Sequence, residues 1–161
     1  MELEKGIVEM KEQYNIDVIA HWFLTQSSMT HKKLQKLCYY AEAWHQALYN
    51  SSLIKNCRFE AWVHGPVCPE LYDKYKDYGW AEIKQIEDNT ELDPETEEFL
   101  EIVYATYGEF SGHQLENITH NESPWREARE ELEEYQPSNK VINPETMRTY
   151  YYSLYEKSQN D

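Results

Sequence analysis

Apolar residues recur at steps of three and four between residues 34 and 48. They are Leu34, Leu37, Cys38, Ala41 and Leu48, and His45 falls on the same stripe. This spacing is typical of one face of an α-helix, and a stripe of this length has to be buried against other elements. Thr30 stands just before the stripe and is a residue type favoured at helix N-caps. The pattern therefore predicts a helix that follows Thr30 and contributes to the core. Three lysines lie beside or behind the stripe: Lys32, Lys33 and Lys36.

Further helix starts are marked by caps and prolines. Proline suits the first turn of a helix because its missing N–H would have no partner there. Such starts occur at Pro69, Asp93-Pro94, Ser123-Pro124 and Asn143-Pro144. Residues 111–114 have the spacing of a capping box, and Asn15 or Asp17 begins another helix through Leu24.

Residues 58–63 alternate in the manner of a short strand, with Phe59, Ala61 and Val63 on one side. Gly65-Pro66 is then expected to break the chain. If the inward face is the apolar one, Trp62 points outward. A strand buried on both sides is the alternative.

These patterns predict a mainly α fold, a compact single-domain bundle of about six or seven helices with a short strand or hairpin near residues 58–63. A length of 161 residues suits one domain. We expect that domain to span residues 15–157, after an N-terminal lead-in at 1–14. Residues 82–92 and 136–142 are expected to be loops.

Charge limits the partners that the chain can take. The net charge is −15, which argues against a nucleic-acid binder because such proteins need a basic face. Residues 31–76 nevertheless carry seven basic and four acidic residues, a local net charge of +3. Three cysteines without a secretory signal indicate a reduced, cytoplasmic protein, and no apolar run is long enough to span a membrane.

Cysteine and histidine side chains are the candidate metal ligands and nucleophiles of this sequence. Cys57, His64 and Cys68 match no standard zinc spacing. Cys68 beside His64 lacks a third orienting group for nucleophilic catalysis. We therefore expect no catalytic residue, no cofactor and no metal. The competing class is a hydrolytic or metal enzyme that uses His64, Cys68 and His120.

Three motifs follow one another in a specific order. They are K-L-Q-K-L-x-Y-Y at Lys33–Tyr40, E-A-W-x-x-G-P-V at Glu60–Val67 and T-H-x-E-x-P-W at Thr119–Trp125. In this order they resemble the Panacea antitoxin domain, a SocA-like group of phage-associated proteins. The resemblance covers roughly residues 15–152.

The resemblance implies an antitoxin that neutralises a co-encoded toxin, encoded by a neighbouring gene, by direct protein–protein binding. One branch of the family acts as a protease adaptor, so delivery of the toxin to a cellular protease is the alternative. Many relatives carry an additional DNA-binding helix-turn-helix. We expect no DNA binding by this chain alone, because the matched span leaves no room for that segment.

The family motifs also supply candidate residues for toxin binding or for the polar framework. These are Lys33, Gln35, Lys36, Trp62, Gly65, Pro66, Tyr72, His120, Pro124 and Trp125. Among them, an outward Trp62 with Tyr72 and Lys36 nearby is expected to form an anchor with a polar rim, since Trp and Tyr are common at binding hot spots.

Overall fold

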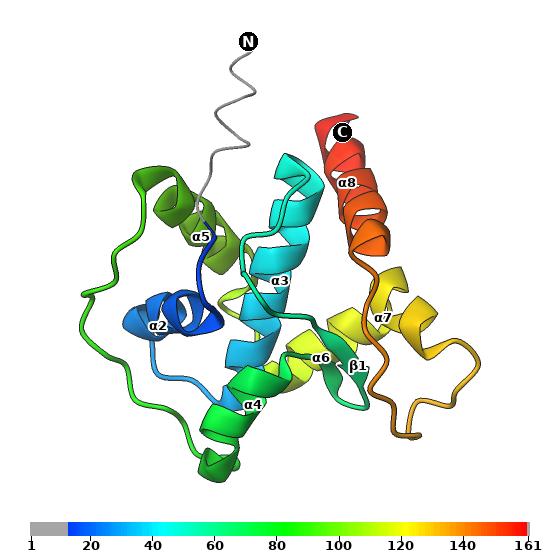
Figure 1. The fold of residues 1–161 in the computed structure, drawn as a ribbon, viewed down its shortest axis with the longest axis horizontal. Coiled ribbons are helices and arrows are strands. Elements are labelled where there is room, and N and C mark those ends of the chain that lie inside the picture. The colour runs from blue at the N-terminus through cyan, green and yellow to red at the C-terminus, as the bar shows by residue number, and fades with distance from the viewer. Residues whose placement is uncertain (1–12, 161) are drawn as a thin grey trace.

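Helix α3 (His31–Tyr49) runs through the middle of the molecule, and the other elements surround it (Figure 1). It packs against α2, α4, α5, α6, α8 and the hairpin strand β2. Every residue from Leu34 to Ala43 is buried, so this helix is covered on all sides and not on one face alone. The polar side chains on its far side must therefore find partners inside the protein.

The computed structural model describes residues 13–160, and within them the fold is mainly helical, as predicted. Seven α-helices and one short 3₁₀ helix occur in this range, with one two-stranded antiparallel hairpin. The elements are α2 (Ile16–Gln26), α3, β1 (Glu60–Trp62), β2 (Gly65–Val67), α4 (Pro69–Tyr75), η1 (Lys76–Tyr78), α5 (Pro94–Tyr107), α6 (Gly112–His120), α7 (Ser123–Arg129) and α8 (Pro144–Asn160).

The predicted helix starts are confirmed. The Thr30 side chain accepts a hydrogen bond from the Lys33 N–H, and Asp93 caps α5 in the same way through Thr96. Ser111 and Gln114 form the reciprocal capping box of α6. Proline occupies the first residue of α4, α5 and α8 and the second residue of α7.

Several details differ from the sequence-based expectation. Leu48 lies on the predicted stripe, one residue before the end of α3, and is 38% exposed. Helix α7 ends at Arg129, so Leu132 lies in the following turn and is exposed. Val63 is only partly buried because it lies in the hairpin turn. Most of the predicted lead-in at 1–14 lies outside the described residues, but Tyr14 is a core residue whose hydroxyl donates to Asp93.

The prediction that Gly65-Pro66 breaks the chain is wrong. The two residues form strand β2, in which Ala61 pairs with Pro66 and Trp62 pairs with Gly65. Gly65 adopts a φ of +107°, a conformation that L-residues rarely adopt, and this allows the tight return of the hairpin.

A buried carboxylate joins α3 to α8. Glu122 lies just before α7, and its Oε1 accepts hydrogen bonds from the hydroxyls of Tyr40 on α3 and Tyr151 on α8. Burial raises the pKa of Glu122 to about 7, although the two hydroxyls oppose the shift.

This raised pKa predicts how stability depends on pH. Between the ordinary pKa of 4.5 and about 7, the folded state holds a proton on Glu122 that the unfolded chain has lost. Its contribution to the free energy of unfolding therefore falls as pH rises through this window, by up to about 1.4 kcal/mol per pH unit. The Glu122→Gln variant keeps the acceptor but cannot ionise. We expect it to lose less stability than the wild type between pH 5 and 8 in urea denaturation.

The exposed Glu98→Gln is the matched control and should follow the wild type. Equal pH dependence in Glu122→Gln and the wild type would contradict the assignment.

Candidate functional site

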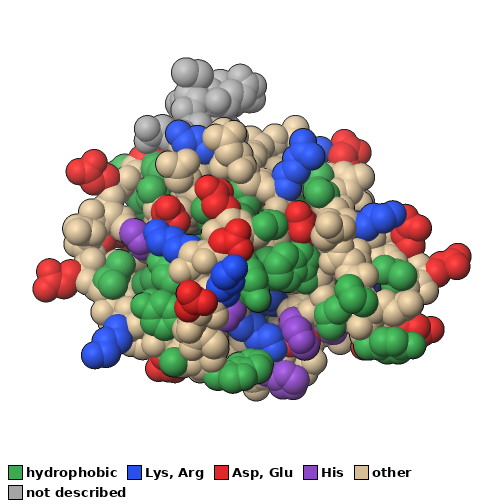
Figure 2. Space-filling view, turned by 60° about the horizontal axis from the view of Figure 1, so that its bottom comes forward, with side chains coloured by type: hydrophobic (Ala, Val, Ile, Leu, Met, Phe, Trp, Pro, Cys, Tyr) green, Lys and Arg blue, Asp and Glu red, His purple; other side chains and the backbone are tan. Residues whose placement is uncertain are grey.

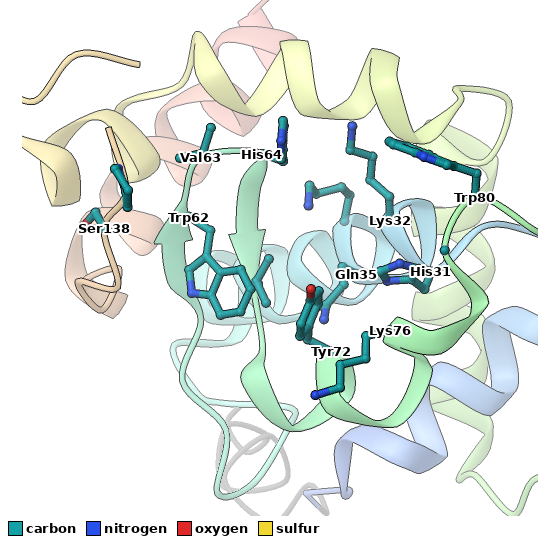
Figure 3. A pocket seen from close by; sticks show the side chains of 14 residues that line it. His31, Lys32, Gln35, Trp62, Val63, His64, Tyr72, Lys76, Trp80 and Ser138 are labelled. Atoms are coloured by element: carbon teal, nitrogen blue, oxygen red, sulfur yellow. The ribbon is translucent and has the colours of Figure 1, made fainter. Parts of the chain in front are cut away.

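A pocket of about 480 Å³ opens between the first half of α3, the hairpin, and the segment from α4 to Trp80 (Figure 3). Its walls come from segments that are far apart in the sequence. The lining residues are His31, Lys32, Gln35, Lys36, Trp62, Val63, His64, Val67, Tyr72, Lys76, Gly79, Trp80, Pro137 and Ser138.

None of these lining residues is acidic, although the chain has a net charge of −15. Three are lysines and two are histidines. In the view of Figure 2, histidine and lysine side chains gather with hydrophobic ones near the lower middle of the face. The local charge contrast predicted for residues 31–76 is thus found around a hollow with aromatic walls.

Aromatic rings form two sides of the pocket. Trp62 and Tyr72 meet edge to face, with ring centroids 4.9 Å apart. The Trp62 indole N–H donates to Glu60, and the side chain remains partly exposed while Phe59 and Ala61 are buried. On the other side lies Trp80, which the sequence analysis did not single out (Figure 3).

Trp80 is 83% exposed and follows a short turn at Gly79. The Lys32 Nζ lies 5.7 Å from the centre of its ring, within the range of a cation–π contact. An exposed tryptophan after a glycine turn is the sequence signal that could have revealed it.

Lys36 lies at the inner wall and not at a surface rim, so that part of the sequence-based expectation is wrong. It is 1% exposed because α3 is covered on all sides, and its Nζ donates to the Pro66 carbonyl at 3.2 Å. Burial lowers the pKa of Lys36 to about 7; the charge of Lys32 adds to this shift and that of Glu116 opposes it.

Behind the pocket wall, Glu116 on α6 pairs with Lys32 and with the Nδ1 of His64. Burial alone would raise the pKa of Glu116, but the hydrogen bonds from these two groups outweigh it and hold the pKa below its ordinary value. This carboxylate therefore orients the Lys32 and His64 side chains around the pocket.

The remaining motif residues support the backbone. Gln35 makes two hydrogen bonds with the backbone of Cys68, and Lys33 donates to the carbonyl of Gly108. The Trp125 indole donates to the carbonyl of Trp62 at 2.8 Å, and His120 stacks on Trp125. Gly65, Pro66 and Pro124 are buried in the backbone frame.

Of the ten candidates, the structure brings Gln35, Lys36, Trp62 and Tyr72 together at the pocket. The other six are not lining residues. Most of them pack against or bond to the backbone near the hairpin and α3, the elements that carry most of the lining residues.

The three residues of the competing enzyme class, His64, Cys68 and His120, each contact a different partner. His64 bonds to Glu116, and the Cys68 thiol contacts that of Cys57, with the two sulfur atoms 2.8 Å apart. Within residues 13–160, no group of three or more His, Cys, Asp or Glu side chains is arranged to hold a metal ion.

The family model described as "Antitoxin SocA-like, Panacea domain" matches residues 34–126, which is more than half of the chain. The chain therefore belongs to this antitoxin family. Searches of the curated proteins and of the solved structures found no match. None of the helices that the structure describes is long and apolar enough to cross a membrane.

The lowered pKa of Lys36 makes stability depend on pH above neutrality. Between about 7 and the ordinary 10.5, the unfolded chain holds a proton that the folded state lacks. The free energy of unfolding should therefore rise with pH, by up to about 1.4 kcal/mol per pH unit. We expect Lys36→Met to lack this rise between pH 7 and 9 in urea denaturation, and to be at least as stable as the wild type at pH 7.

Lys84→Met, at an exposed position, is the control and should retain the rise. A Lys36→Met protein with the wild-type slope would show that another group titrates.

Gly65 lies against Lys36, and this contact can be tested. A Cβ at Gly65 would lie 2.5 Å from the Lys36 Cε, and the φ of +107° is unfavourable for any other residue. We expect Gly65→Ala to lower the free energy of unfolding by about 2–4 kcal/mol, from backbone strain and steric overlap together. Gly79→Ala has a positive φ with no atom within 4 Å, so it reports strain alone. Equal losses of unfolding free energy in the two variants would mean that the Lys36 side chain moves aside without a measurable loss of stability.

Proposed function

We propose that this protein is an antitoxin that neutralises a toxin encoded by a neighbouring gene, by direct binding in the cytoplasm. The observation that carries the proposal is the family match over residues 34–126. The toxin partner and its binding mode are part of the proposal.

The face around the pocket is the surface we propose for this contact. Trp62, Tyr72 and Trp80 supply large aromatic area, and such residues dominate the binding energy of protein interfaces. Lys32 and Lys76 supply cationic groups at this face of an acidic molecule, and their ion-pair partners, Glu116 and Asp73, do not line the pocket. An acidic surface on the toxin would be attracted to it and aligned by it.

The packing beneath this face supports the same proposal. The hairpin that carries Trp62 is held from below, because Trp125 and Arg129 donate to the carbonyls of Trp62 and Ala61. A side chain already held in one place loses less conformational entropy on binding. Tyr72 comes from α4, whose N-cap residue Cys68 is bonded to Gln35.

The test is binding and growth rescue with the product of the neighbouring gene. We expect Trp62→Ala to weaken toxin binding by about thirtyfold or more, the size of a hot-spot loss of at least 2 kcal/mol, and to reduce rescue on co-expression. Tyr135→Ala is the matched control, since Tyr135 is 76% exposed and does not line the pocket. Circular dichroism should show both variants folded.

Wild-type binding by folded Trp62→Ala and Trp80→Ala would overturn the proposed face. Absence of any complex between the two wild-type proteins would overturn neutralisation by binding. Loss of toxin from cells only when a protease is present would instead support the adaptor alternative.

A further inference from the structure

Lys36 has more hydrogen-bonding capacity than the fold uses. Its ammonium group has three donors, and the Pro66 carbonyl is the acceptor found for it. A buried amine with few partners is costly, and an apolar side chain of similar length would serve packing better. His31 lines the same pocket, and within residues 13–160 its buried Nδ1 has no hydrogen-bond partner. Both groups are suited to an acceptor that enters the pocket.

The charge around these groups favours an anion. Lys32 lies in the first turn of α3, where the helix dipole also attracts negative charge, and Lys36 lies one turn further along the helix. Lys76 stands at the opposite side of the opening (Figure 3). Two carboxylates that do not line the pocket pair with these lysines: Glu116 with Lys32 and Asp73 with Lys76.

The remaining wall favours a flat ring. Trp62 and Tyr72 stand side by side across the pocket from Lys32 and Trp80 (Figure 3). A volume of about 480 Å³ lies within the range of small-molecule sites. The pocket thus combines aromatic rings that can stack on a ligand with cationic hydrogen-bond donors. Its volume suits one small ligand.

We propose that this pocket binds a nucleoside phosphate, with the phosphate groups at Lys32 and Lys36 and the base against the aromatic side chains. A phosphate offers several acceptor oxygens and up to two charges, enough for Lys32, Lys36 and His31 together. A single carboxylate of a protein partner has only two oxygens. This favours a phosphate over an acidic peptide as the occupant.

The direct test uses the purified full chain without any toxin. Calorimetry and tryptophan fluorescence are recorded with ADP, GDP, adenosine and pyrophosphate as separate probes. We expect ADP or GDP to bind, and adenosine and pyrophosphate to bind at least about tenfold more weakly, since each fills half of the site. Absence of binding by both nucleotides at about 1 mM would overturn the proposal.

Two substitutions in the pocket test where the ligand binds. Lys36→Met should reduce the affinity for the nucleotide by about tenfold or more without lowering the melting temperature, and Trp80→Ala should weaken binding without affecting the fold. The controls Lys84→Met and Tyr135→Ala are exposed and outside the pocket. If both pocket variants bind as the wild type does, the nucleotide binds elsewhere and the proposal is wrong.

Proton uptake on binding distinguishes a lysine that contacts the ligand from a lysine with a purely structural role. Burial lowers the pKa of Lys36 to about 7, so it is mostly neutral at pH 8, and pairing with a phosphate would restore its proton. The charged and titratable groups around it are His31, Lys32, Glu116 and His120. Calorimetry of ADP binding at pH 8 in two buffers of different ionisation enthalpy should show uptake close to one proton, and Lys36→Met should abolish it. Wild-type uptake in Lys36→Met would overturn the role of Lys36.

Because these measurements need no toxin, their failure leaves the antitoxin proposal standing. Failure of toxin binding likewise leaves the ligand proposal to be judged on its own.

Discussion

A helix covered on every side imposes the main constraint on this structure. Polar side chains buried on α3 cannot turn to water, so most of them find a partner within the protein. Glu42 does so by accepting the backbone N–H groups of Leu53 and Ile54, which ties the loop after α3 back to the helix. Gln35 and Lys36 do so by bonding the backbone near the hairpin. The arrangement of the surrounding elements therefore follows from the polar residues of one helix as much as from its apolar stripe.

The same constraint produces the pocket. The bonds of Gln35 and Lys36 to the chain around β2 bring the hairpin against the first half of α3, and Gly65 permits the approach because it has no side chain. Trp125 and Arg129 then fix the outer strand. What remains between α3, the hairpin and α4 is a hollow with cationic and aromatic walls. Framework and candidate site are consequently made from the same short motifs.

Much of the fold could be predicted because its signals are local. Proline and cap residues act within one turn, and the stripe on α3 needs only a period of 3.6, so the helices were found. The pairing of Gly65-Pro66 in a strand was missed, since it depends on Ala61 and Trp62 across the turn and on Lys36 beneath it. The pocket was only partly foreseen. Trp62 and Tyr72 carried a recognisable residue type, whereas the burial of Lys36 and the contribution of Trp80 depend on tertiary packing that no local pattern encodes.

The two buried ionisable groups, Glu122 and Lys36, have a joint consequence for the lifetime of the protein. Burial moves both pKa values to about 7, from opposite directions. Near neutral pH both groups are partly charged inside the protein, so their combined contribution to stability is smallest at the pH of most cells. Degradation by proteases follows the population of open molecules when opening is fast. A partner or ligand that pairs a negative charge with the protonated Lys36 would stabilise the folded state. It would therefore also slow degradation, so that the amount of protein would depend on how much of the pocket is occupied.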